Sequence, residues 1–249
     1  MKQGLKRIAK SVVFRVRRDE QTGHLYYPVG GRRLYIRIAD ECMPRKVQRW
    51  VGTELYFKHY RPSGRDVVVD FGAGLGDEIL DLAKTAPDIR YIAVEIQPWV
   101  YECLCLTLAQ LPDGYIPCGL AVGSEAAVRM TPTAVGLDAS VTESGPIPVE
   151  GISWEQFTAK YDIDQVDLLK MNVEGAEGDL LDHIDLGHVK RIIVSVHDFM
   201  ADRGRGDRYR TRARVEKRLR EAGYNLTRFE GEQDWLRSWI YAERSGPRT

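Results

Sequence analysis

Short apolar runs alternate with longer stretches of helical periodicity through most of this chain. The apolar runs predict strands at residues 67–71, 91–95, 116–122, 166–172, 191–197, 226–229 and 239–242. Helices are predicted between them at residues 77–85, 99–111, 153–161, 178–184 and 212–222. Strands alternating with helices predict an α/β fold with a mainly parallel sheet, because parallel strands need a crossover connection. The last two strands lack a helix of that length between them and are expected to form an antiparallel hairpin.

The first 60 residues have a different pattern. Residues 2–18 contain seven Lys or Arg and no acidic residue, with apolar side chains near helical spacing. They predict a basic amphipathic helix that either docks on the body or lies on anionic lipid. Residues 24–39 alternate around Gly30-Gly31 and predict a β-hairpin. We therefore expect an N-terminal cap at 1–60 and a main domain at 61–249, separated by Arg61-Pro62-Ser63-Gly64.

Composition narrows the class of protein only modestly. Lys plus Arg and Asp plus Glu each number 36, so the bulk charge gives no argument for a nucleic-acid partner. The four cysteines form no C-x-x-C pair, which argues against a disulfide framework or a structural zinc site. No apolar run reaches the length of a membrane span. We expect a cytoplasmic protein, with peripheral contact at the inner membrane surface through residues 2–18 as the alternative.

A glycine-rich turn follows the first strand of the main domain. It reads Asp70-Phe71-Gly72-Ala73-Gly74-Leu75-Gly76, and Asp77 stands where a dinucleotide fingerprint has its third glycine. An acid two residues before a G-x-G-x-G turn is typical of S-adenosylmethionine-dependent enzymes. The backbone from Gly72 through Ala73 and Gly74 to Gly76 would approach the cofactor, and Asp70 would bind its amino-acid end.

A second acid follows the next strand. Glu95 lies 19 residues after Gly76, near the spacing expected for a carboxylate on ribose hydroxyls. Ile96, Ala121 and Val122 lie at strand ends, where they either contact the adenine or belong to the core. Asn172, at the end of the fourth strand, is expected at the boundary between cofactor and acceptor.

The fourth strand continues into Lys170-Met171-Asn172-Val173-Glu174-Gly175-Ala176-Glu177. This string resembles the FkbM methyltransferase family, in which Lys-x-Asp-Val-Glu-Gly-x-Glu follows a hydrophobic strand. The resemblance spans roughly residues 52–241 and continues at 191–197, where the family's strand ends in Glu-x-His. It implies a Rossmann-like class I fold that binds S-adenosylmethionine and methylates a hydroxyl of a sugar, glycolipid or secondary metabolite, releasing S-adenosylhomocysteine. Asn172 and Ser195 replace an expected Asp and Glu, so altered or lost chemistry is an alternative.

Methylation of an alcohol needs a general base, and histidine has the most suitable pKa. His197, at the end of the fifth strand, is the predicted base, oriented by Glu174 or Asp198. Lys170 would hold the acceptor or pair with Glu174, and Asn172 would lie beside them. Asn172, Glu174, His197 and Asp198 could also ligate a divalent metal, but no metal site is expected.

Nine basic residues and three acids occupy positions 202–220, directly after His197. This run is either a solvated helix face or a lid that attracts an anionic acceptor. The expected partner is therefore a small-molecule or glycan acceptor, with no nucleic acid and with a homodimer left open. An RNA or protein methyltransferase, or a catalytically silent cofactor-binding module that recruits a glycan or membrane partner, is the alternative function.

Overall fold

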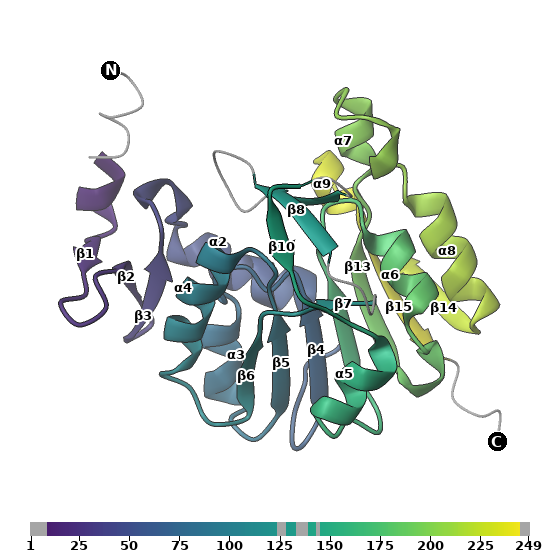
Figure 1. The fold of residues 1–249 in the computed structure, drawn as a ribbon, viewed down its shortest axis with the longest axis horizontal. Helices are drawn as coiled ribbons and strands as arrows, with labels where there is room; N and C mark the ends of the chain where they lie inside the picture. The colour runs from purple at the N-terminus through teal and green to yellow at the C-terminus, as the bar shows by residue number, and fades with distance from the viewer. Residues whose placement is uncertain (1–8, 124–127, 133–138, 143–144, 245–249) are drawn as a thin grey trace.

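Seven strands form one sheet in the computed structural model, which describes residues 9–123, 128–132, 139–142 and 145–244 (Figure 1). In chain order they are β4 (Val67–Phe71), β5 (Arg90–Val94), β6 (Tyr115–Cys118), β12 (Leu168–Met171), β13 (Arg191–Ser195), β14 (Tyr224–Arg228) and β15 (Trp239–Arg244). Their order in space is β14-β15-β13-β12-β4-β5-β6. The first five pair in parallel, and β15 joins both β13 and β14 in antiparallel register. The predicted mainly parallel sheet with a C-terminal antiparallel hairpin is confirmed.

Helices cover both faces of this sheet. One face packs against α3 (Ile79–Thr85), α4 (Pro98–Leu108) and η2 (Val51–Tyr56). The other packs against α5 (Trp154–Lys160), α6 (Glu177–His183) and α8 (Arg212–Glu221). Val68 and Val69 point to opposite faces, and neither is exposed to solvent. Burial on both faces explains why the parallel strands are continuous apolar runs rather than alternating ones.

The strand order places a crevice at the carboxyl ends of the parallel strands. From β4 the chain proceeds to β5 and β6 on one side, and then returns to β12 and β13 on the other side. In such sheets the ligand site lies beyond the carboxyl ends of the strands at the point of reversal, here between β4 and β12. The glycine turn follows β4, and the Asn172–Glu177 string follows β12, so both lie at this point.

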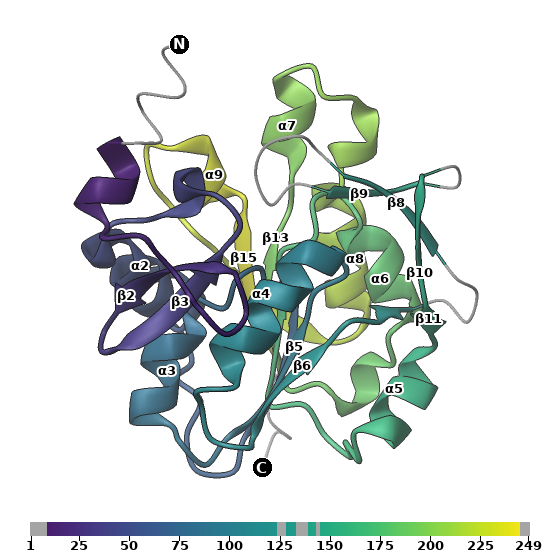
Figure 2. The same ribbon diagram turned by 60° about the vertical axis from the view of Figure 1, so that its left-hand side comes forward.

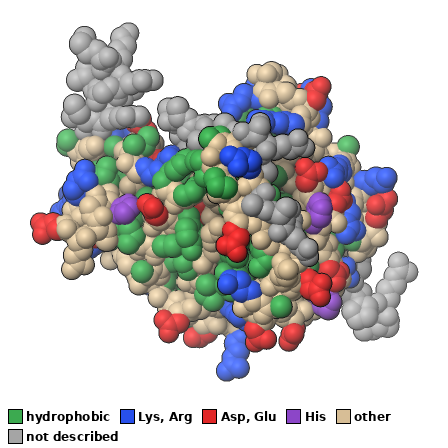
Figure 3. Space-filling model, in the orientation of Figure 1, with side chains coloured by type: hydrophobic (Ala, Val, Ile, Leu, Met, Phe, Trp, Pro, Cys, Tyr) green, Lys and Arg blue, Asp and Glu red, His purple; other side chains and the backbone are tan. Residues whose placement is uncertain are grey.

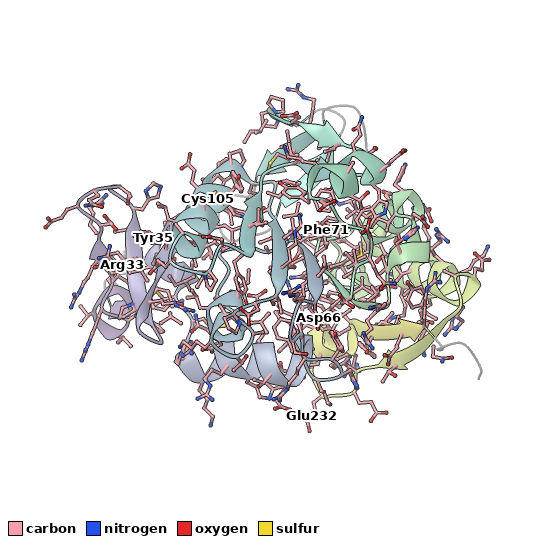
Figure 4. The ribbon with its side chains drawn as sticks, turned by 90° about the horizontal axis from the view of Figure 1, so that it is seen from below. Arg33, Tyr35, Asp66, Phe71, Cys105 and Glu232 are labelled. Carbon is pink, nitrogen blue, oxygen red and sulfur yellow. The ribbon has the colours of Figure 1, made fainter. Side chains whose placement is uncertain are left out.

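The N-terminal part carries a small antiparallel sheet of β1 (Arg17–Arg18), β2 (Leu25–Val29) and β3 (Arg32–Ile36). The predicted hairpin at 24–39 is confirmed. Asp19 ties this sheet together, because its Oδ2 accepts hydrogen bonds from Arg33 Nη1 at 2.7 Å and from Tyr35 Oη at 2.6 Å. Figure 4 places Arg33 and Tyr35 on this outer sheet, away from Phe71 in the main sheet. Residues 9–13 are helical, and the earlier part of the predicted basic helix lies outside the described residues.

Several short elements were not predicted. They are η1 (Ala39–Glu41), α2 (Arg45–Trp50), η2, η3 (Leu186–His188), α7 (Asp198–Asp202), η4 (Asp207–Tyr209) and α9 (Asp234–Arg237). Segments of three to six residues are too short to show a helical period. Among the described residues, no helix combines the length and apolar character needed to cross a bilayer.

Between β7 (Ala121–Val122) and β11 (Gly151–Ile152) the chain forms a second small sheet beside the main one. β8 (Val128–Pro132), β9 (Ala139–Thr142) and β10 (Ile147–Val149) form an antiparallel sheet in the order β10-β8-β9. Figure 2 shows this sheet beyond the carboxyl edge of the main sheet. The predicted third strand at 116–122 is shorter than expected, because the chain leaves the main sheet after Cys118 and β7 pairs with β11.

The boundaries of the remaining elements follow local signals. Ser153 caps α5 in a capping box, with its Oγ accepting from Gln156 N at 3.1 Å and Gln156 Oε1 accepting from Ser153 N at 3.2 Å. The other predicted helices and strands are present with ends displaced by at most three residues, which is close to the usual uncertainty of such boundaries.

Candidate functional site

A cavity of about 600 Å³ opens at the carboxyl edge between β4, β5 and β12. It brings together seven of the residues predicted to bind cofactor or acceptor: Gly72, Glu95, Ile96, Ala121, Val122, Asn172 and Glu174. The other predicted residues lie outside its wall: Asp70, Ala73, Gly74, Gly76, Lys170 and His197. The cavity therefore gathers most of the residues predicted to bind the cofactor at one end, here called the cofactor end, whereas the residues predicted to be catalytic are arranged differently from the expectation.

The glycine turn after β4 brings the backbone close to β12. Gly72 has a φ of +79°, and a Cβ there would collide with the carbonyl oxygen of Asn172. Only glycine satisfies both constraints without strain. Glycine is needed at Gly76 for a different reason, because a Cβ there would come within 2.9 Å of Leu104 on α4. The turn thus shapes the cavity at Gly72 and allows close helix packing at Gly76.

Glu95 forms the polar centre of the cofactor end. Its carboxylate accepts hydrogen bonds from Gly74 N at 3.1 Å and from Gln97 N at 2.8 Å, so the turn and the end of β5 hold it in place. Burial raises the pKa of Glu95 to about 7 against the opposing effect of these hydrogen bonds. Its remaining lone pairs can accept from two ribose hydroxyls. Ile96, Ala121 and Val122 line the wall beside it, as a planar adenine requires.

Asp70 and Lys170 form a sealed ion pair on the α3 side of the sheet. Lys170 Nζ lies 2.7 Å from Asp70 Oδ1 and 3.1 Å from Glu78 Oε1, and it also lies 4.6 Å from the centre of the Tyr56 ring. Burial alone would lower the pKa of Lys170, but the two carboxylates outweigh burial and raise it. Tyr91 Oη donates to the other oxygen of Asp70 at 2.6 Å.

This arrangement corrects two expectations. Lys170 is 1% exposed and Asp70 is fully buried, so neither reaches the cavity wall. Lys170 therefore neither holds an acceptor nor pairs with Glu174, and Asp70 has its oxygens occupied by protein groups instead of presenting them to a cofactor.

His197 lies between two carboxylates at the end of β13. Its Nδ1 is 2.5 Å from Glu177 Oε1, and its Nε2 is 3.3 Å from Glu174 Oε1. Burial favours the neutral ring, but the hydrogen bonds to Glu174 and Glu177 prevail and raise the pKa of His197 to about 10. The ring is therefore an imidazolium at neutral pH and has no lone pair to accept a proton. This corrects the assignment of His197 as general base.

Glu174 is the member of this cluster that reaches the cavity. Its side chain is 23% exposed and lines the wall, while Glu177 is fully buried. Glu174 also has a φ of +49°, and Gly175 follows with +99°. A left-handed backbone at a residue other than glycine costs about 1–3 kcal/mol and is concentrated at functional sites. Here the strained turn aims the Glu174 carboxylate at both His197 and the cavity.

The partner that was missed from the sequence is Glu177. It lies in the string Lys170–Glu177 and 20 residues before His197, but a carboxylate with no exposed surface gives no separate sequence signal.

The expected orienting role of Asp198 is also corrected. Its Oδ2 accepts from the backbone nitrogens of Thr211 and Arg212 and so caps α8. Ser195 is the last residue of β13 and is buried, and its Oγ lies 3.1 Å from Ser238 Oγ.

Arginines from the basic run form the opposite rim of the cavity, and Figure 3 shows Lys and Arg gathered around α7 and along α8. Arg210 pairs with Asp202 and Asp207, and Arg214 pairs with Asp179 and Asp182. Arg208 contacts Tyr209, whose Oη accepts from its Nη2 at 2.9 Å, and it pairs with no carboxylate in the described part of the chain. Within the same residues no group of three or more His, Cys, Asp or Glu is arranged to hold a metal ion.

Comparisons with known proteins agree with this geometry. A family model described as the methyltransferase FkbM domain matches residues 70–226, more than half of the chain. No curated protein matches this chain. A fibrillarin/Nop5p complex is similar in structure, with a TM-score of 0.50, 17% identity and coverage of 93% of this chain and 98% of that chain.

Two further solved structures are similar at lower scores. Aeropyrum pernix fibrillarin with bound S-adenosyl-L-methionine has a TM-score of 0.46 and 14% identity, covering 91% of this chain and 97% of the other. A putative caffeoyl-CoA O-methyltransferase from Staphylococcus aureus has a TM-score of 0.48 and 13% identity, covering 81% of this chain and 85% of the other. At these identities the likeness concerns the fold alone.

Proposed function

This chain belongs to the FkbM methyltransferase family, and on that premise we propose that it methylates a hydroxyl oxygen of a sugar, a glycolipid or a secondary metabolite. The enzyme is a methyltransferase that depends on S-adenosylmethionine. When bound, this cofactor supplies an electrophilic methyl group on a sulfonium. The protein must hold the acceptor oxygen in line with that methyl group and take up the hydroxyl proton.

The cofactor end of the cavity supports this proposal. Glu95 offers a buried carboxylate to the ribose, Gly72 allows close approach of the backbone, and Ile96 and Val122 supply apolar walls. These groups converge in one cavity although they come from three separate strand ends. This donor set fits a nucleoside cofactor that has no pyrophosphate, because Asp77 stands where a dinucleotide-binding turn has its third glycine.

The observation that carries the proposal is the position of Glu174. It is the carboxylate of the His197 cluster that lines the cavity, and a strained backbone aims it there. In the proposed step the Glu174 carboxylate would take up the hydroxyl proton as the oxygen bonds to the methyl carbon, and the methyl–sulfur bond would break with its electron pair going to the sulfur of S-adenosylhomocysteine. The His197 imidazolium orients Glu174 through Nε2, and Glu177 holds the ring from the other side.

Arg208 supports a narrower acceptor class. It lines the same cavity as Glu174, and the other two arginines of the cavity wall, Arg210 and Arg214, already have carboxylate partners. A guanidinium without a carboxylate partner suits a phosphate or carboxylate group. We therefore propose an acceptor that carries an anionic group near the hydroxyl to be methylated.

The test has a binding step and a turnover step. Calorimetry with S-adenosylmethionine measures cofactor affinity, and release of labelled methyl groups measures turnover on matched pairs of acidic and neutral hydroxylated acceptors. We expect turnover on the acidic members. Arg208→Gln should remove the preference for them while leaving cofactor affinity unchanged. Arg205→Gln, a change at another exposed arginine outside the cavity wall, is the matched control.

The same assay distinguishes the alternatives. Labelling of RNA or protein instead of the small acceptors would favour the other methyltransferase classes. Cofactor binding with no turnover on any acceptor would favour a silent module and would contradict the role given to Glu174.

A further inference from the structure

Four large hydrophobic side chains stand exposed in the described part of the chain, and all four lie on two neighbouring segments. Val12 and Val13 belong to the helical residues 9–13 and are 73% and 75% exposed. Val47 and Trp50 belong to α2 and are 43% and 40% exposed. Single exposed apolar residues are common on soluble proteins, but a cluster of them marks an interaction surface.

A shallow groove joins the two segments. It is lined by Val13 and Arg15 from one side, by Met43 and Gln48 from the other, and by strand β2 at its floor. Phe14 anchors the N-terminal segment, because its ring packs edge-on against Tyr27 at 5.7 Å between centroids. The inward side of the segment is therefore fixed, and Val12 and Val13 point outward on a supported element.

The charged side chains that belong to these two segments are all basic. Residues 9–18 contribute Lys10, Arg15, Arg17 and Arg18, and α2 contributes Arg45, Lys46 and Arg49, with no acidic residue in either segment. Arg45 pairs with Asp81. Arg15, Lys46 and Arg49 form an ion pair with no carboxylate of the described residues, so their charges are available to an external partner.

We propose that residues 9–18 together with α2, here called the basic apolar surface, bind a membrane that contains anionic lipid. Valine and tryptophan side chains enter the boundary between headgroups and acyl chains, while Arg15, Lys46 and Arg49 contact the anionic headgroups. A second copy of this chain fits less well, because a twofold contact would bring two surfaces of the same positive sign together. This inference does not depend on the proposed function.

The helical residues 9–13 and the cavity lie on the same side of the molecule. Figures 1 and 2 both show these residues on the upper side, which also carries α7 and the β8–β10 sheet, although Figure 1 places them at the opposite end of the long axis from α7. A membrane bound there would therefore lie on the side of the carboxyl ends of the parallel strands.

The experiment measures binding of the full chain to sedimenting vesicles of phosphatidylcholine alone and of phosphatidylcholine mixed with phosphatidylglycerol. We expect binding only to the mixed vesicles, weakening as salt is added. Val12→Asp with Val13→Asp should lower the partition coefficient about tenfold or more, because two apolar anchors are lost. Arg15→Glu, Lys46→Glu and Arg49→Glu together should lower it about 100-fold, since each cation near an anionic surface contributes appreciably.

A matched triple variant with the same change in net charge separates this surface from general electrostatics. Arg65→Glu, Lys160→Glu and Lys217→Glu lie on exposed positions elsewhere and should leave binding within about twofold of the unchanged protein. Melting temperatures confirm that each variant is folded. Equal binding to neutral vesicles, no binding to either kind, or equal losses in the two triple variants would each overturn the proposal.

Discussion

Two buried cations in this molecule are each held between two carboxylates, but only one of the two clusters reaches the cavity. Lys170 lies between Asp70 and Glu78, and His197 lies between Glu177 and Glu174. The first cluster is closed, because none of its members lines the cavity. The second opens to the cavity through Glu174 alone. The contrast indicates that access, rather than charge pattern, separates a structural cluster from a site that can act on an acceptor.

Removing the cation from the closed cluster should have the largest effect on stability. Lys170→Met leaves Asp70 and Glu78 buried without a partner, and breaking a buried pair in this way costs about 3–5 kcal/mol in the free energy of unfolding. Urea unfolding measures this loss. Lys190→Met is the matched control, because Lys190 pairs with Asp167 with its side chain 44% exposed and should lose less than about 1 kcal/mol. Similar losses in the two variants would contradict the structural role of Lys170.

Altering the open cluster should instead affect turnover. Glu174→Gln keeps the shape of the side chain but cannot take up the hydroxyl proton, so we expect turnover to fall about 10²–10⁴-fold. Cofactor affinity should change little, because Glu95 belongs to a separate wall, whereas the free energy of unfolding should fall modestly, because His197 loses one of its two carboxylate partners. Glu155→Gln, at an exposed carboxylate on α5, controls for the substitution itself. Unchanged turnover in Glu174→Gln would remove the assignment.

The two clusters also mark what the sequence could and could not predict. The fold was predictable because its strands are buried on both faces and its turns carry glycine, so the signals are strong and local. The placement of Gly72, Glu95 and Asn172 followed from their positions at strand ends. Lys170 was misplaced because a strand residue faces one side of the sheet, and only the pairing of β12 with β4 puts it beside Asp70.

The protonation state of His197 could not be predicted from the sequence. Histidine has an ordinary pKa near neutrality, and only the three-dimensional approach of Glu174, in the turn after β12, and of Glu177, the first residue of α6, fixes its charge. The π-helical η2 was missed for a related reason, since its six residues follow α2 without a turn signal and are stabilised by packing of Leu55 under the sheet.

The charge on His197 gives a prediction of intermediate size. With its pKa raised to about 10, the ring should remain protonated through neutral pH. Glu177→Gln should lower this pKa by about two units, because it replaces the carboxylate at Nδ1 with a neutral amide. Titration of the ¹⁵N-labelled imidazole measures both values. A His197 ring that is neutral at pH 7 would contradict this account.

The same shift predicts how stability depends on pH. Since the folded pKa of His197 is raised above its ordinary value of 6.5, its stabilising contribution is complete below that value and is lost as pH rises through about 10. The free energy of unfolding of the unchanged protein should therefore fall between neutral and alkaline pH more steeply than that of His197→Gln. Parallel pH profiles for the two proteins would show that the cluster does not hold the imidazolium.

The smallest predicted effect belongs to the cofactor end, where a single carboxylate has no cation beside it. Burial raises the pKa of Glu95 to about 7, and the ionised form is the better acceptor for two ribose hydroxyls. Affinity for S-adenosylhomocysteine should therefore rise about tenfold between roughly pH 6 and pH 8, following the ionised fraction. Calorimetry measures this, and Glu95→Gln should bind more weakly with the pH dependence removed. Because His197 stays protonated throughout this range, a rise that persists in Glu95→Gln would mean that another group controls cofactor binding and that the ribose does not contact Glu95.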